Sequence, residues 1–72
     1  MMVSDLIRIA AAGGGLQLDC EKYMIYDLIR IVAAGSQKQS MILLENCKKL
    51  SAYDAIKIAE AGNGYVIFKD LK

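Results

Sequence analysis

Apolar residues recur at helical spacing in three separate stretches of the chain. In each stretch the positions i, i+3 and i+4 are apolar: Leu6, Ile9 and Ala10; Leu28, Ile31 and Val32; Ala55, Ile58 and Ala59. This periodicity predicts three amphipathic helices, each with one apolar stripe. A glycine follows each stretch, at Gly13, Gly35 and Gly62. We expect each glycine to end its helix in the left-handed conformation that glycine adopts without steric cost.

A short run rich in β-formers follows each predicted helix. These runs are "LQLDC" from Leu16, "MILLENC" from Met41 and "YVIFKDL" from Tyr65. Helices and strands that alternate in units this short favour parallel strands joined by right-handed crossovers. The predicted fold class is therefore α/β, with a three-stranded parallel sheet and helices on one face. The five-residue insertion "SQKQS" at 36–40 falls between helix and strand, and we expect it to be a mobile loop.

The helix–strand unit is written three times. Asp5, Asp27 and Asp54 occupy matching places, and the glycines that end the helices keep the same two spacings. "CEKYMIYDLIRIVAAG" from Cys20 aligns without gaps on "CKKLSAYDAIKIAEAG" from Cys47. Residues 1–72 thus read as a single domain of three α–β repeats, at about 1–20, 21–47 and 48–72.

The segment "LLENCKKLSAYDAIKIAEAGNGYVIF" resembles the cysteine-containing class of leucine-rich repeats. Leu43, Asn46, Cys47 and Leu50 lie near the places of that family's L-x-x-[N/C]-x-L run, whereas Glu45 stands where the pattern has an apolar residue. The chain is also similar to short bacterial proteins of unassigned function built from the same D-L-I-R-I-A-x-A-G unit. The resemblance implies a short solenoid that binds other proteins, and it implies no catalytic activity.

Charge and composition exclude several functions. Nine Lys or Arg balance eight Asp or Glu, so the net charge of +1 gives no footprint for nucleic acid or an anionic membrane. The absence of histidine excludes Ser–His and Cys–His catalytic pairs and most zinc sites. No run approaches the ~18 apolar residues of a membrane span. We expect no enzyme, no cofactor and no metal, and the low cysteine content indicates the reducing cytoplasm.

The two cysteines, Cys20 and Cys47, occupy equivalent places on neighbouring predicted strands. They should therefore lie close together. One interpretation is a redox pair. The other, which we favour, is two buried thiols that pack as small apolar residues.

The predicted strand faces suggest where a partner binds. We place Leu16, Leu18 and Cys20 toward the helices, and the spacing from glycine to strand in the third unit points Tyr65 and Ile67 the same way. The opposite face then exposes an apolar patch to water: Ile42, Leu44, Val66 and Phe68. Such patches mark interfaces, and parallel sheets normally have both faces buried. The prediction is a non-catalytic protein–protein interaction module that self-associates through its uncovered sheet face or edges, as a homodimer or higher homo-oligomer, with another protein as a further partner.

An alternative function stays open. The carboxyl ends of parallel strands carry ligand sites in α/β proteins. Lys22, Lys48 and Lys49 fall at that rim, where they could gather a small anionic ligand for a regulatory domain. The interpretation that we favour is that they are ordinary lysines that keep a loop solvated.

Overall fold

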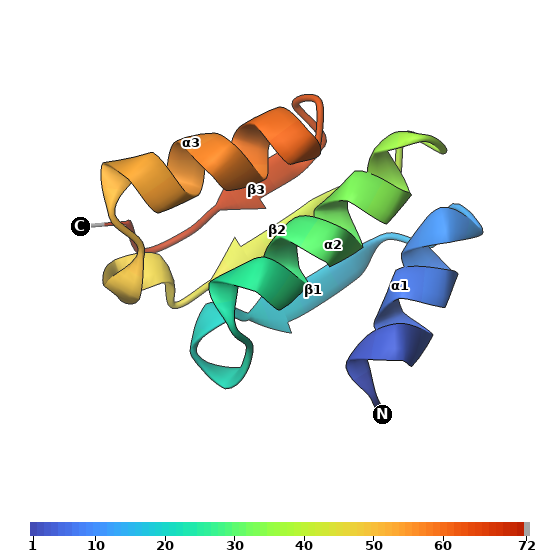
Figure 1. Cartoon of the computed structure of the whole chain (residues 1–72), viewed down its shortest axis with the longest axis horizontal. Coiled ribbons are helices and arrows are strands. Elements are labelled where there is room, and N and C mark those ends of the chain that lie inside the picture. The colour runs from blue at the N-terminus through green and yellow to red at the C-terminus, as the bar shows by residue number, and fades with distance from the viewer. Residues whose placement is uncertain (72) are drawn as a thin grey trace.

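The computed structural model describes residues 1–71 and consists of three α-helices, three strands and two short 3-10 helices (Figure 1). In chain order these are α1 Val3–Ala11, β1 Leu16–Asp19, η1 Cys20–Lys22, α2 Ile25–Ser36, β2 Ile42–Glu45, η2 Cys47–Lys49, α3 Ala52–Ala61 and β3 Val66–Phe68.

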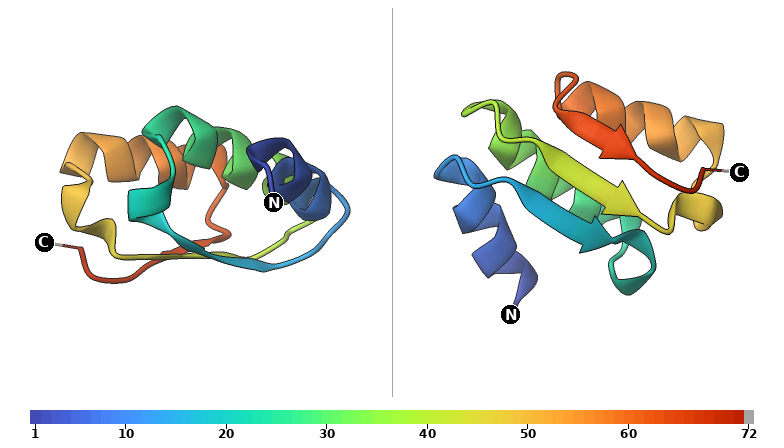
Figure 2. Two further views of the ribbon diagram at one scale, coloured as in Figure 1. Left: turned by 90° about the horizontal axis from the view of Figure 1, so that it is seen from below. Right: turned by 180° about the vertical axis from the view of Figure 1, so that it is seen from behind.

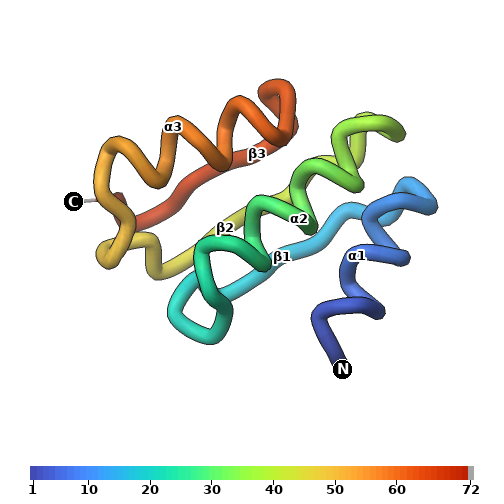
Figure 3. Tube along the Cα trace, viewed as in Figure 1, coloured from blue at the N-terminus to red at the C-terminus, as the bar shows by residue number. Residues whose placement is uncertain are grey.

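The strands form one open parallel sheet in the order β1-β2-β3. All three helices lie side by side on one face of this sheet, and the other face carries no helix (Figure 2). The helix layer is wider than the sheet, so α1 and α3 lie beyond β1 and β3 on either side (Figures 1 and 3). The predicted mixed α/β fold with its three-stranded parallel sheet is confirmed.

The hydrophobic core fills the space between the two layers. Its buried members are Leu6, Ala10, Leu18, Cys20, Leu28, Ile31, Val32, Ile42, Leu44, Cys47, Leu50 and Ile58. Helix α2 has a helix on each side, and it supplies three of these residues, whereas α3 supplies one. The centre of the core therefore lies beneath α2.

The glycines end the helices in different ways. Gly13 has φ +104° and takes the predicted left-handed position after α1. Gly35 lies inside α2, and Gly62 is the C-cap of α3 with φ −87°, so the prediction is wrong at both. After α3, Asn63 takes the left-handed conformation, with a φ of +51° that is close to the value of a left-handed helix. Gly62 is needed because a Cβ at this position would collide with the side chain of Val66.

The register of the sheet decides which strand residues face the core. The residues in register across the three strands are Leu16, Ile42 and Val66, and next to them Leu18, Leu44 and Phe68. Residues in register on parallel strands point to the same face of a sheet. All six therefore point toward the helices.

The predicted water-facing patch is therefore wrong. Ile42 and Leu44 are fully buried under the helices, and Val66 and Phe68 are half-buried against the core. Ile67, which the sequence assigned to the core side, is 47% exposed on the opposite face.

One residue at the end of α3 accounts for the error in β3, and β2 was placed on the same wrong face as β3. The repeat aligns Gly62 with Gly13, but Gly62 is the C-cap of its helix, whereas in α1 the C-cap is Ala12. Counted from the C-cap, both strands begin after the same interval, at Leu16 and at Val66. Because side chains alternate along a strand, a shift of one residue moves every side chain to the other face.

The central position of α2 leads to a stability prediction. Ile31→Ala should lower the free energy of unfolding by about 2–5 kcal/mol, because Ile31 is fully buried in the core. Ile56→Ala, at an exposed position of α3, should change it by less than about 0.5 kcal/mol. Urea denaturation of the two variants in dilute solution measures both values. Equal losses would contradict a core centred on α2.

Candidate functional site

The uncovered sheet face is the first candidate surface. Gln17, Leu43 and Ile67 lie in register across it, one from each strand. Leu43 is half-buried at the centre, and Met41, directly before β2, is 43% exposed. Gln17 donates a hydrogen bond to the Glu45 carboxylate at 2.9 Å, so one end of this face is polar. The face thus combines a few apolar side chains with polar neighbours, and it is smaller and less apolar than the predicted patch.

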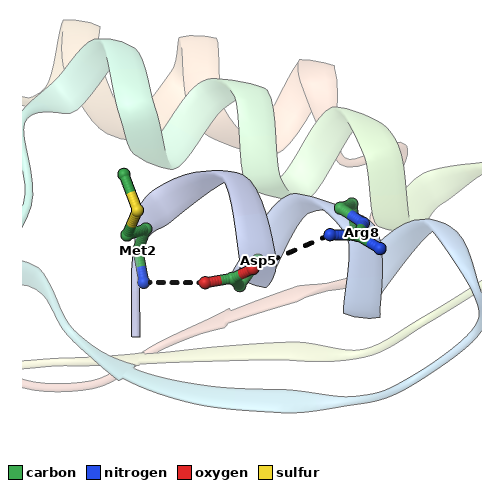
Figure 4. Close-up of polar contacts among 3 residues, drawn as sticks. All are labelled: Met2, Asp5 and Arg8. Carbon is green, nitrogen blue, oxygen red and sulfur yellow. Dashed lines mark hydrogen bonds and ion pairs between the residues drawn. The ribbon is translucent and has the colours of Figure 1, made fainter.

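The outer flank of α1, which faces away from α2, is the second candidate surface. It carries a shallow pocket of about 490 Å³ lined by Met1, Asp5, Arg8, Ile9 and Ala12. Figure 4 shows the polar side of this flank, where Asp5 accepts a hydrogen bond from the Met2 backbone N–H at 3.1 Å and pairs with Arg8 at 3.9 Å. The Arg8 side chain is 83% exposed, so this ion pair contributes little to stability and is free to meet a partner.

The two thiols lie in contact at the carboxyl end of the sheet. Cys20 and Cys47 begin η1 and η2, and their Sγ atoms are 3.2 Å apart. Both residues are fully buried, and Cys47 Sγ also donates to the Leu44 carbonyl at 3.2 Å. Burial, followed by the neighbouring Cys47 thiol, raises the pKa of Cys20 to about 12. The predicted proximity and burial are confirmed, and the environment is that of unreactive core thiols.

The three lysines lie where the sequence placed them. Lys22 is in η1, and Lys48 and Lys49 are in η2, beside it at the carboxyl end of the strands. All three are exposed. The Lys49 amine donates a hydrogen bond of 2.6 Å to the Tyr23 carbonyl, so one of its three donors already links η2 to the end of η1.

A carboxylate shares this rim with the lysines. Asp19 accepts a hydrogen bond from the Glu21 backbone N–H at 2.9 Å. This bond, then one from Asn46 and the charges of Lys22 and Lys49, lowers the pKa of Asp19. A permanently ionised Asp19 competes with any anion for the same lysines, which weakens the case for an anion site.

Ser40 is a structural residue that the sequence analysis missed. It is buried, and its hydroxyl donates a hydrogen bond of 3.0 Å to the Ala10 carbonyl near the end of α1. The segment 36–40, predicted as a mobile loop, is therefore fixed to α1 at its last residue. The repeat carries no signal for this contact, because the residues at the matching places before β1 and β3 are Gly14 and Gly64, which have no side chain to make it.

Residues 1–71 offer neither a candidate metal centre nor a helix that could span a membrane. No group of three or more Cys, Asp or Glu side chains in this part of the chain could hold a metal ion. Of the helices in the same residues, none combines the length and the apolar character that crossing a membrane requires.

No family model, curated protein or solved structure matches the chain.

The thiol geometry predicts slow chemistry. Neither Cys20 nor Cys47 should react with a disulfide reagent such as 5,5′-dithiobis(2-nitrobenzoate) until the protein unfolds, since both are fully buried. Absorbance of the released thiolate, with and without urea, measures this. Rapid labelling of the native protein would contradict the buried placement.

The raised pKa of Cys20 predicts a pH dependence of stability. An unfolded thiol loses its proton near pH 9.0, whereas Cys20 in the folded protein keeps it until about 12. Unfolding between these values releases a proton, so the free energy of unfolding should fall as the pH rises from about 9 to 12 and be unaffected below. A Cys20→Ala variant, which retains every other ionisable group of the chain, should show a shallower fall. Equal slopes would rule out this contribution.

Proposed function

We propose that this protein is a small, non-catalytic protein–protein interaction module. In this proposal it is a short solenoid like the leucine-rich repeats, and it associates with further copies of itself through the parts of the sheet layer that the helices leave uncovered. The observation that carries the proposal is the one-sided cover of the sheet, with all helices on a single face (Figure 2).

The uncovered face supports self-association through its apolar side chains. Parallel sheets normally have both faces buried, because an uncovered face leaves apolar side chains of the strands in water. Ile67 and Met41 are 47% and 43% exposed here, and both lie beside the half-buried Leu43. A partner that covers them removes apolar surface from water at roughly 25 cal/mol per Å².

The sheet edges supply a second driving force. Within residues 1–71, β1 and β3 each pair with β2 alone, so each has one edge without a strand partner. Backbone N–H and C=O groups along such an edge form a template for another strand. Closing these edges with a further strand satisfies the backbone groups without any change of fold.

A non-catalytic role agrees with the chemistry that the chain offers. The sequence has no histidine to act as a general base near neutral pH. Its two thiols are fully buried, and the pKa of Cys20 is far above neutrality, so the strongest nucleophiles of the chain are protonated or inaccessible. The anion-binding alternative has less support, because Lys49 and Asp19 already take part in contacts at the lysine rim.

The proposal predicts a concentration-dependent assembly. Sedimentation velocity of the pure protein from ~1 µM to ~100 µM should show species heavier than the monomer, with a fraction that grows with concentration. A ligand that binds only the native state raises the melting temperature. Because the proposal includes no anion site, addition of inorganic phosphate should leave the melting temperature unchanged. A single monomeric species at every concentration would refute self-association, and a phosphate-dependent rise would favour the anion-binding alternative.

A further inference from the structure

The three helices carry isoleucines at matching positions on two flanks. The first set lies two residues after the repeated aspartate of each unit and consists of Ile7, Ile29 and Ile56. The second set lies two residues further along each helix and consists of Ile9, Ile31 and Ile58. Burial differs among members of each set, although their residue type and place in the helix are the same. The difference shows which neighbour each flank requires.

The second set is covered only where a helix precedes it. Ile31 on α2 and Ile58 on α3 are fully buried, whereas Ile9 on α1 is half-buried and lines the pocket described above. Within the described residues no helix precedes α1. This set therefore lies on the flank that packs against the preceding unit, and we call it the rear flank.

The ion pair beside the rear flank responds in the same way. On α1 the side chains of Arg8 and Asp5 are 83% and 43% exposed. On α2 the matching Arg30 and Asp27 are 49% and 23% exposed. Part of this difference is local to α2, because the Arg30 guanidinium lies over the Tyr26 ring at 5.6 Å and α1 has Ser4 at the matching position.

The first set is covered only where a helix follows it. Ile7 and Ile29 are half-buried and pack against the core. Ile56, on α3, is 56% exposed, and no helix follows α3 within the described residues. We call this the front flank. The chain contains the contact of a front flank with a rear flank twice, between α1 and α2 and between α2 and α3.

We propose that the chain associates head to tail, with the front flank of α3 in one copy packed on the rear flank of α1 in the next. Ile56 would then enter the pocket beside Ile9 and Ala12. This mode of assembly rests on the proposed self-association, and it places the contact at the helix flanks and strand edges rather than at the uncovered sheet face. The partner is a second copy of this chain, because the two open flanks are the two halves of a junction that the chain already makes internally.

The sheet supports the same arrangement. Leu16 N–H donates to the Met41 carbonyl at 3.2 Å, and Ile42 N–H donates to the Tyr65 carbonyl at 3.0 Å. If this ladder continues into the next copy, Val66 N–H donates to the Gly15 carbonyl of that copy, and its β1 lies parallel to β3. The unpaired edges of β1 and β3 then satisfy each other.

Head-to-tail contact differs from a twofold dimer in a measurable way. It joins two different surfaces, so it produces an open chain or a ring, whereas a twofold contact stops at two copies. Repeat arrays need caps at their ends to stay monomeric, and neither end of the described chain has a polar cap over its apolar flank.

Two exposed isoleucines provide a matched test. Ile56→Arg places a charge on the front flank, and Ile67→Arg places the same charge on the uncovered sheet face. The two side chains are similarly exposed, Ile56 at 56% and Ile67 at 47%. Sedimentation velocity should show that Ile56→Arg weakens assembly by about tenfold or more, while Ile67→Arg leaves it unchanged. Circular dichroism before each run establishes that both variants are folded.

Mixing two blocked variants tests the head-to-tail geometry directly. Ala12→Arg blocks the rear flank at an exposed residue of the pocket, and Ile56→Arg blocks the front flank. Each variant alone should be monomeric, and an equimolar mixture should form a complex of one copy of each and nothing longer. The added charges have the same sign, so the blocked ends repel each other.

The contrary results separate the two proposals. A wild-type dimer that Ile67→Arg dissociates and Ile56→Arg does not would overturn the head-to-tail inference and leave self-association standing. Failure of the mixed variants to form a complex, with a wild-type protein that assembles, would also overturn the inference alone. A wild-type protein that is monomeric throughout would overturn both.

Discussion

The apolar layer between the helices and the sheet is the interaction on which the rest of the structure depends. Its centre is formed by three residues of α2: Leu28, Ile31 and Val32. Among the helices of the described residues, α2 is the only one with a helix on each side. The outer units gain their burial by packing on this middle unit. Because each unit contacts only its neighbours, stability accumulates from one unit to the next, and a unit at either end lacks half of its contacts.

This incompleteness locates the surfaces available for function. The open flanks and strand edges of the chain repeat the residues that form its interior junctions. The same residues that hold the domain together between units are exposed where no further unit follows. In the proposed assembly, structure and interaction would therefore use one kind of contact, at the surfaces that the fold has not covered.

Much of the architecture was predictable from the pattern of the sequence. The threefold recurrence of apolar spacing gave the helices, their alternation with β-rich runs gave the parallel order, and the alignment of Cys20 with Cys47 gave the contact between the thiols. These features depend on periodicity and order, which do not change when a helix end moves by one residue.

The faces of β2 and β3 were not predictable in this way, because the face of a strand changes with a shift of one residue. The extra residue of α3 before its C-cap is such a shift, and the repeated glycine conceals it. Two charged residues pointed to the correct face. Glu45 and Lys69 fell on the predicted core side, and the structure places Glu45 beside Gln17 on the uncovered face and leaves Lys69 exposed. The unfavourable burial of these charges was a stronger constraint than the spacing from the glycine.

The greater width of the helix layer has a geometric consequence for any assembly of these units. Neighbouring helix axes are about 8–10 Å apart, whereas neighbouring strands are about 4.8 Å apart. Because the spacing between helices is larger than the spacing between strands, the two joined layers cannot extend in a straight line. Each added unit would therefore bend the array toward the sheet side. The helices would form the convex surface of the resulting arc. The uncovered sheet face, with Leu43 and Ile67, would line the concave side, where its side chains from successive copies converge on a common interior.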